Sequence, residues 1–530
     1  MSLAGRALAR RAWRDARVRV VAFGYLFLIY AYVQPVGYRH AYPSLADRAA
    51  FARSFGGNTA IRLFYGQPHD LLSIGGYCAW RVSGTLTIAA AAFGLLASVR
   101  ALRTEEDAGR AELVLAGALG RTAAYRSSLA AIGAGIAVLW VAELAGSLAG
   151  GLALGDSAYM ALATVSVAFV CAGIGALACQ LAPTRRVALD IGGAAVGLLF
   201  VLRVVADTAG GAGWLRWATP LGWAEELRPF AGARPLVLVL PVLAGVLLLG
   251  LAWRIALRRD IGTGLLRERD SAPARPGLLS SPTRQALRGE RSSLAVWLVS
   301  VGAFAFILGT ISSSVSAVGV SKKIQQEIAR LGVGSILTPV GYLSFVFLFF
   351  VLAISLFACA QLSAARREEA EGRLETLLAL PATRGAWLGG RLLLAGAAAV
   401  ILSLAAGLFA WVGAASQGQS IALSRMLEAG ANCLPAALLF LALAALAFAL
   451  LPRAASGIAY TLVVLAFLWQ LVGSLLGAPR WLVDLTPFQH IGLVPAQALR
   501  TGSAVVMLGI AALAAACALA VFRRRDILGQ

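Results

Sequence analysis

The residues best suited to specific polar contacts lie in two short segments that match each other. Residues 103–121 read RTEEDAGRAELVLAGALGR, and residues 366–384 read RREEAEGRLETLLALPATR. The two align without a gap at an offset of 263 residues, and both gather acidic side chains although the chain has only 25 Asp and Glu against 46 Lys and Arg. A repeated acidic segment in a basic chain predicts a docking surface for a partner, with a solvated loop helix as the alternative.

The spacing within each segment predicts one short helix. Glu106 precedes Arg110 by four residues, which is the favourable order for an ion pair along a helix. The second segment repeats this spacing with Glu369 and Arg373. We therefore expect these two pairs to form within their own helices, each lying at the cytoplasmic face.

One further ionisable side chain lies inside an apolar stretch. Glu143 falls in AVLWVAELAGSLAG, where a charge near the bilayer centre costs about 2.5–3.5 kcal/mol. We expect it to face the interior of a helix bundle and to pair with Arg81 or Arg203, which makes these three residues candidates for a transport pathway. A proton-linked role, a structural ion pair and a protonated, hydrogen-bonded acid all stay open. The repeat places Ala406 at the corresponding position, so any role is asymmetric.

Other chemistries lack their residues in this sequence. No GxxxxGK[ST] phosphate-binding loop occurs, and the only lysines are the adjacent Lys322 and Lys323. We therefore expect no ATP hydrolysis by this chain, whose energy must come from a partner or an ion gradient. His40, His69 and His490 have no metal-ligand spacing, and the six cysteines form no CxxC pair. We expect no catalytic residues, no metal and no cofactor in this chain.

The elements that carry these residues are transmembrane helices. Hydrophobic residues make up 59% of the chain and charged residues 13%, and the mean hydropathy is +0.79, whereas soluble domains carry about 25% charged residues. Apolar runs of about 20 residues cross a bilayer as helices, which satisfy their own backbone hydrogen bonds. The sequence predicts an all-α integral membrane protein with about twelve transmembrane helices, at residues 18–36, 76–99, 123–151, 157–182, 187–206, 235–257, 294–316, 338–362, 387–413, 431–451, 455–476 and 503–522.

The distribution of charge predicts orientation. The formal net charge is +21, and each arginine cluster abuts the end of an apolar run, as in cytoplasmic loops. We therefore expect a multi-pass protein of the cell membrane with both termini in the cytoplasm and with loops 37–75, 207–234, 317–337 and 477–502 outside. Such a basic surface suits anionic lipid headgroups. Nucleic-acid binding is not expected, because no binding module accompanies the charge.

Further matches extend the repeat over the chain. WLRWATP at 214–220 matches WLVDLTP at 481–487, and RRDIG at 258–262 matches RRDILG at 524–529. Duplication of a six-span half gives two parallel repeats. The predicted organisation is a first half over 1–262, a cytoplasmic linker with an amphipathic helix over 263–293, and a second half over 294–530. Residues 6–14 predict a similar amphipathic helix, and the Trp- and Pro-containing segments 214–230 and 481–498 predict outer-side amphipathic or re-entrant helices, with aromatic anchoring as the alternative.

These motifs resemble those of the type-2 ABC exporter permeases, and within them the fused twelve-span polyketide-antibiotic (tetronasin-type) exporters. The resemblance rests on the R-x-E-E-x-x-G-R-x-E-x-x-L-A segments, the W-x-x-x-x-T-P segments and the RRD ends, and it covers nearly the whole chain. It implies that the helix between the second and third spans of each half couples to a separate ATPase. By position this role falls to Glu105, Glu106, Gly109, Arg110 and Glu112, and to Glu368, Glu369, Gly372, Arg373 and Glu375. The copies differ where Ala118 aligns with Pro381.

The resulting hypothesis is a permease that moves a hydrophobic or amphipathic compound, such as a drug, a polyketide antibiotic or a lipid, out of the cytoplasm or the inner leaflet. Two copies of an ABC ATPase would supply the energy, with ATP and Mg²⁺ bound by that partner. The main alternative is a proton-coupled secondary exporter that uses Glu143 as its proton site. A membrane enzyme has no support, because no paired catalytic groups meet in any loop.

Overall fold

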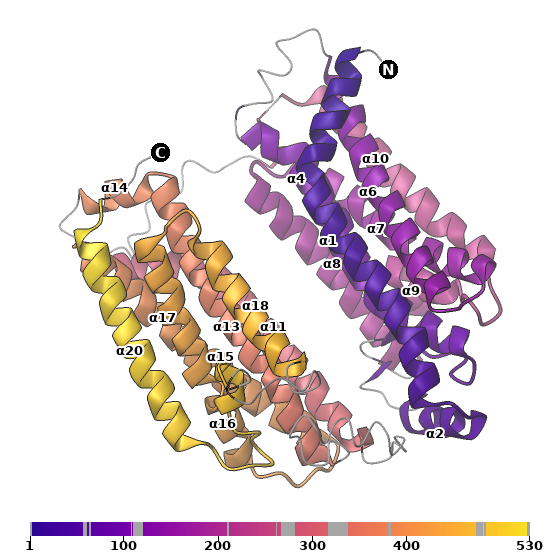
Figure 1. The fold of residues 1–530 in the computed structure, drawn as a ribbon. Coiled ribbons are helices and arrows are strands. Elements are labelled where there is room, and N and C mark those ends of the chain that lie inside the picture. The colour runs from indigo at the N-terminus through magenta and orange to yellow at the C-terminus, as the bar shows by residue number, and fades with distance from the viewer. Residues whose placement is uncertain are drawn as a thin grey trace. The chain divides into compact units, whose positions relative to one another are not determined.

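The computed structural model describes residues 3–56, 61–62, 65–107, 109, 120–208, 211–260, 262–266, 281–315, 338–379, 383–472, 481 and 484–526. The chain divides into two compact units, Met1–Ala272 and Pro273–Gln530, and each is described by itself (Figure 1). Within the described ranges the regular elements are all helices. The all-α class predicted from the sequence is confirmed.

The first unit is a bundle of long helices joined by loops that carry short helices. The long ones are α1 (Leu3–Ala41), α4 (Ile74–Asp107), α6 (Arg121–Ala149), α7 (Leu154–Leu181), α8 (Arg185–Thr208) and α10 (Val239–Arg258). The short ones are α2 (Leu45–Gly56), η1 (Gly213–Ala218), α9 (Pro220–Glu226) and η2 (Pro235–Leu238).

The second unit repeats this order. Its long helices are α11 (Pro282–Val315), α13 (Pro339–Ala370), α15 (Arg384–Ser416), α17 (Leu434–Leu450), α18 (Ala455–Val472) and α20 (Thr501–Arg524). Its short helices are α14 (Arg373–Leu378), α16 (Leu423–Ala431) and η3 (Pro487–His490).

The long helices have the length and composition of membrane spans. Among the described residues, eleven helices are long and apolar enough to cross a bilayer, and Ala455–Gln470 of α18 is a shorter apolar helix. The expectation of about twelve spans is confirmed. The expected amphipathic helix over residues 6–14 is not separate from the first span, because α1 runs from Leu3 to Ala41 without a break. No Pro or Gly interrupts residues 6–23, so the helix continues through them.

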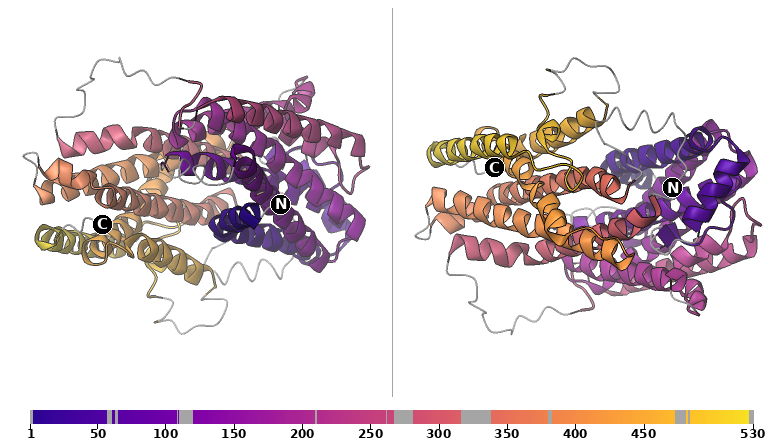
Figure 2. Two further views of the ribbon diagram at one scale, coloured as in Figure 1. Left: turned by 90° about the horizontal axis from the view of Figure 1, so that it is seen from above. Right: turned by 90° about the horizontal axis from the view of Figure 1, so that it is seen from below.

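The same helix pairs pack together in both units (Figures 1 and 2). α1 lies along α6 as α11 lies along α15, α4 contacts α7 as α13 contacts α17, and α7 contacts α10 as α17 contacts α20. Small residues let the first pair approach closely. A Cβ at Gly146 of α6 would meet the backbone of Leu28, and one at Gly413 of α15 would meet the backbone of Phe306. The duplication seen in the sequence thus extends to packing.

Each unit has central and peripheral helices. In the first unit, 78% of an apolar 18-residue stretch of α7 is buried, and 67% of the corresponding stretch of α4. The buried shares are only 17% for α8 and 22% for α10. In the second unit the corresponding values are 67% for α13 and 22% for α20. The peripheral helices turn large apolar side chains outward, such as Leu198 and Leu247, which are 60% and 61% exposed. Such apolar surfaces are unfavourable in water and favourable against lipid chains.

Candidate functional site

Both acidic segments begin at the end of a long helix. We call this end of each unit, where α4 or α13 ends and α6 or α15 begins, the coupling end. Glu106 lies in the last turn of α4 and Glu369 in the last turn of α13. Beyond them, Gly109 has φ +68° and Gly372 has φ +71°, in the left-handed region that glycine adopts without strain. In the second unit the short helix α14 follows, so Gly372 divides the segment between the end of α13 and α14, where the spacing predicts one short helix.

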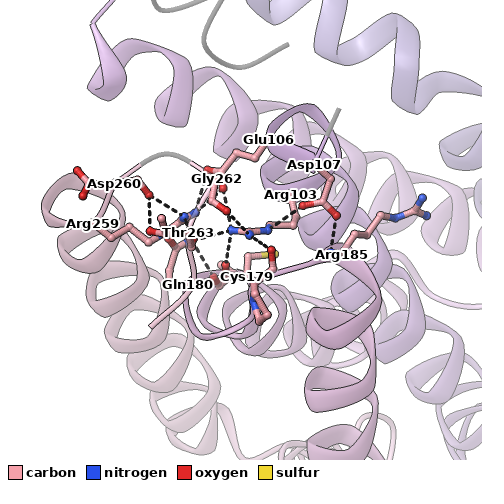
Figure 3. A network of polar contacts seen from close by, with 12 residues as sticks. Arg103, Glu106, Asp107, Cys179, Gln180, Arg185, Arg259, Asp260, Gly262 and Thr263 are labelled. Atoms are coloured by element: carbon pink, nitrogen blue, oxygen red, sulfur yellow. Dashed lines mark hydrogen bonds and ion pairs between the residues drawn. The ribbon is translucent and has the colours of Figure 1, made fainter. Parts of the chain in front are cut away.

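In the first unit Glu106 binds the arginine that follows the last long helix (Figure 3). The Oε2 atom of Glu106 lies 2.6 Å from Nη2 of Arg259, directly after α10. Nε of Arg259 donates to Oε1 of Gln180 at the end of α7, at 2.7 Å. Nη1 of Arg121, at the start of α6, donates to the carbonyl of Arg259 at 3.1 Å. One arginine therefore joins the ends of α4, α6, α7 and α10.

The second unit contains the same arrangement. Arg525, directly after α20, forms an ion pair with Glu369 and donates to the carbonyl of Phe448 in α17, at 2.6 Å. Arg384, at the start of α15, donates to the carbonyl of Arg525 at 2.7 Å. The Arg525 guanidinium also lies 5.1 Å from the ring centroids of Phe448 and Phe522. We call these two arrangements the helix-end clasps.

Burial makes each clasp a strong contact. The side chains of Arg259 and Glu369 are 6% and 5% exposed. Removing one partner of a buried ion pair leaves an uncompensated charge, which costs about 3–5 kcal/mol. Glu106 and Glu369 therefore hold helix ends together inside each unit. The EE and RRD repeats, which the sequence showed separately, are partners in the fold.

Arg103 adds a second anchor in the first unit. Its side chain is fully buried and binds Glu106 at 2.8 Å and Asp107 at 3.1 Å. It also donates to the carbonyls of Pro183, between α7 and α8, and of Thr263, after α10. Reasoning from the sequence missed this role. The sequence feature that could have indicated it is the identity of Arg103 with Arg366 in the repeat. Arg366 itself is partly exposed.

The expected pairing of Glu369 with Arg373 is wrong. Glu369 binds Arg525, and Arg373 binds Glu371 instead. A four-residue spacing brings side chains together only within one helix, and α13 ends at Ala370 before the left-handed Gly372. The counterpart, Glu106 with Arg110, cannot be compared, because Arg110 lies outside the described residues.

The other predicted coupling residues separate into engaged and exposed groups. Glu368 forms an ion pair with Arg391 of α15. Arg373 and Glu375 are exposed on α14, and among the described side chains the ion pair of this helix is that of Arg373 with Glu371. Glu112 and the side chain of Glu105 lie outside the described residues.

Glu143 pairs with neither expected arginine. Its fully buried carboxyl accepts a hydrogen bond at Oε1 from the Thr164 hydroxyl of α7, at 3.0 Å. Arg203 instead forms ion pairs with Asp207 and Glu225, and Arg81 lies 4.0 Å from the ring centroid of Tyr65. The expected pair is wrong because acids from α8 and α9 reach Arg203. A hydrogen-bonded acid is the alternative that matches this geometry.

The opposite end of the first unit holds a polar cluster that reasoning from the sequence missed. Arg203 of α8 binds Asp207 at 2.9 Å and Glu225 of α9 at 2.6 Å. Arg216 of η1 binds Asp207 at 2.7 Å, and Glu226 lies 3.5 Å from Arg216. Burial raises the pKa of Glu225 to about 7, with the attraction of Arg203 opposing this shift. The sequence feature that could have indicated this cluster is the group of charged residues within segment 214–230.

The α9 segment packs deep between the long helices. The Thr219 hydroxyl caps α9 by accepting from the Gly222 amide at 3.0 Å, and Pro220 takes the first helical position. Leu221 and Ala224 pack with Ala91, Val167 and Cys171, about midway along α4 and α7. In the second unit Thr486 caps η3 in the same way. The repeated T-P motif is thus a helix start, and in the first unit the helix that it begins packs among the long helices.

Neither polar region has the donors of a metal centre. In the part of the chain that the structure describes, no group of three or more His, Cys, Asp or Glu side chains is placed to hold a metal ion. The arrangement provides a mechanical connection between helix ends. The clasps join helix ends, and in the second unit these lie beside the exposed charged helix α14.

Comparison with known proteins agrees with this two-unit organisation. The family described as "Multidrug efflux system permease Rv1217c, C-terminal domain" matches residues 12–254 and 279–523, one match in each unit. The multidrug efflux system permease protein Rv1217c of Mycobacterium tuberculosis (strain H37Rv) is 31% identical over 493 residues. The alignment covers 92% of this chain and 88% of that relative.

Proposed function

Since this chain belongs to the family of multidrug efflux system permeases that the Rv1217c domain defines, we propose that it is the permease of an ATP-driven exporter. In this proposal separate ATPase subunits hydrolyse ATP, and the permease carries the substrate across the membrane. The coupling end of each unit faces the cytoplasm, where the ATPase is.

The observation that carries the proposal is the clasp beside an exposed charged helix. In the second unit α14 presents Arg373 and Glu375 to its surroundings and follows directly on the helix that ends with Glu369. A partner that binds α14 and moves it displaces the end of α13. Through Arg525 the ends of α15, α17 and α20 must follow, because these contacts are short and buried.

The repeat supports two docking positions. Glu106, Arg121 and Arg259 correspond to Glu369, Arg384 and Arg525, and Gly109 adopts the same left-handed conformation as Gly372. Two equivalent positions on one chain fit two copies of one ATPase, with ATP and Mg²⁺ held by that partner.

The proposed substrate is a hydrophobic or amphipathic compound. The transmembrane helices are predominantly apolar, and charged side chains in their interior are few, so a hydrophilic solute would find little to replace its hydration. The resemblance to tetronasin-type exporters favours a polyketide antibiotic within this class, and that assignment stays a prediction.

The alternative, a proton-coupled exporter, rests on Glu143. Its carboxyl is fully buried between α6 and α7, and no described side chain donates to its Oε2 atom. A buried acid with a free oxygen atom is a feature of proton-linked sites as well as of structural ones.

The test compares energy sources in one system. The purified chain should show no ATPase activity alone and should co-purify with two copies of an ATPase per chain. Export of a lipophilic dye should stop on ATP depletion and should persist when the proton gradient is collapsed. The reverse pattern, abolished by Glu143→Gln, would establish the proton-coupled alternative and refute the proposal.

A further inference from the structure

Three arginines from three helices converge at the coupling end of the first unit. Arg19 lies in α1 near the start of the span Trp13–Ala41, Arg100 near the end of α4, and Arg185 at the first position of α8. Arg19 experiences electrostatic repulsion from both Arg100 and Arg185. None of the three forms an ion pair with a carboxylate in the described ranges; Asp15, one turn from Arg19, is the acid that partly offsets the charge.

The acid closest to Arg185 is already engaged. Asp107 accepts one hydrogen bond from Nε of Arg103 at 3.1 Å and another from the backbone amide of Arg185 at 2.5 Å. Figure 3 shows the Arg185 guanidinium pointing away from this network. Its Nε atom is buried and has no hydrogen-bond acceptor in the described part of the chain. A buried donor of this kind points to a missing acceptor.

The cluster lies where apolar surface gives way to charge. On α1, Val18 and Val21 are 74% and 67% exposed, while Arg14 and Arg17 beyond them are exposed and charged. On α4, Leu96 is 42% exposed and lies one turn before Arg100. Outward valine and leucine side chains fit acyl chains, and arginines at their edge fit the headgroup layer.

Packing brings the two helices together beside the cluster. Phe23 of α1 and Phe93 of α4 meet edge to face, with ring centroids 5.4 Å apart. From this contact both helices run on to the coupling end, α1 through Arg19 and α4 through Arg100. The hydrogen bond from the Arg185 amide to Asp107 adds the start of α8. The cluster is thus fixed by the fold.

We propose that Arg19, Arg100 and Arg185 bind the phosphate headgroup of an anionic phospholipid, whose acyl chains lie against Val21 and Leu96. Guanidinium groups bind phosphate with paired, charge-assisted hydrogen bonds. A bound phosphate would remove the repulsion among the three arginines and supply the acceptor that Arg185 lacks. Adjacent apolar side chains favour a lipid over a soluble anion, which has no part that could contact them. The inference requires only that the chain spans a membrane, and it does not depend on how export is driven.

Among the described residues, the second unit lacks the central arginine of this cluster. The repeat aligns Arg100 with Ser363, whose hydroxyl lies 3.0 Å from that of Ser456 near the start of α18. A neutral hydrogen bond therefore stands where the first unit has converging charges. We expect one such lipid site per chain, in the first unit. Arg453, an exposed arginine just before α18, provides a matched control.

The experiment measures lipid binding by the full chain in detergent, by native mass spectrometry with phosphatidylglycerol or phosphatidylcholine of identical acyl chains. The wild type should retain phosphatidylglycerol preferentially. Arg100→Gln should weaken its retention about fivefold, from about 1 kcal/mol per basic residue near an anionic surface. The combined Arg19→Gln, Arg100→Gln and Arg185→Gln variant should lose the preference, whereas Arg453→Gln should keep it.

Three results would overturn the proposal. One is equal retention of the two lipids by the wild type, and another is an undiminished preference in the triple variant. The third is displacement of phosphatidylglycerol by millimolar inorganic phosphate, which would make the site one for a free anion. Intrinsic tryptophan fluorescence checks that the variants fold, and Arg100→Lys, which keeps the charge, should retain most of the preference. Arg100 is exposed, so its substitution leaves no buried group unpaired.

Discussion

At the scale of single residues, the clasp arginines show how one side chain can hold several helix ends. Arg525 has an acid, a carbonyl oxygen and two aromatic rings around its guanidinium. Each contact alone is ordinary. Their convergence on a group that is 13% exposed makes the pair costly to break, because so little exposed a group gains little hydration in place of a lost partner.

The first prediction concerns the acid of the second clasp. Glu369→Gln removes the charge that balances Arg525, and we expect the free energy of unfolding to fall by about 3 kcal/mol, the lower end of the range for a broken buried pair. Thermal unfolding in detergent, followed by tryptophan fluorescence, measures the loss. Glu375→Gln on exposed α14 is the control and should change stability by less than about 0.5 kcal/mol. Equal effects of the two variants would contradict a structural role for Glu369.

A second prediction concerns pH and Glu225. Burial raises its pKa from 4.5 to about 7, so the folded chain holds a proton that the unfolded chain releases. The contribution of this group to stability is therefore present below about pH 4.5 and is lost as the pH rises toward 7. In Glu225→Gln the unfolding temperature should fall less steeply over this window. Glu428→Gln, at an exposed ion pair with Arg425, is the control; a wild-type slope in Glu225→Gln would exclude the assignment.

At the scale of elements, the left-handed glycines fix where each acidic segment leaves its helix. Gly372→Ala places a Cβ in the left-handed region, at a cost of about 1–2 kcal/mol. Nothing within 4 Å among the described residues would clash with that Cβ, so backbone strain is the whole effect. We expect a matching loss in thermal stability, and a smaller one for Gly372→Asn.

The control for this substitution is Gly509→Ala. Gly509 lies in an exposed, ordinary helical position of α20, where alanine should stabilise the helix by about 0.5–1 kcal/mol. Opposite signs at the two glycines are therefore expected. The same sign would show that the conformation at residue 372 is not left-handed in solution.

The sequence allowed the long helices to be predicted closely, because their apolar runs are continuous and end at arginines. The predicted span 187–206 is Arg185–Thr208 in the structure, and 235–257 is Pro235–Arg258. Helix continuity at the N-terminal end was harder to predict. Basic residues 6–19 form a helix whether or not they enter the bilayer, so charge alone does not show whether it joins the first span.

Contacts between distant residues could not be predicted. The EE and RRD motifs were both visible as repeats, but 153 residues separate Glu106 from Arg259 and no local rule joins them. Spacing instead suggested the neighbour at four residues, which the left-handed glycine removes in the second unit. The Arg203 cluster was missed because its acids come from a short helix, α9, whose depth between α4 and α7 depends on packing.

At the scale of the whole molecule, the placement of exposed residues makes the proposed orientation testable. Glu375 is exposed at the coupling end of the second unit, and Gln417, after α15, is exposed at its other end. In a chain carrying Cys517→Ser, which removes the exposed cysteine, Gln417→Cys should react with an impermeant thiol reagent in intact cells. Glu375→Cys should react only after the cells are opened. The opposite pattern would invert the topology.

The position of the clasp arginines also sets an order of events during synthesis. Glu106 emerges from the ribosome 153 residues before Arg259, and Glu369 emerges 156 residues before Arg525. Until the last helix of a unit has passed through the insertion machinery, its acid has no clasp partner. Each unit therefore closes only when its final span is in place, so a nascent first unit is already closed while the second is being inserted. A ribosome stalled before residue 259 would hold an open bundle, which membrane proteases could distinguish from a closed one.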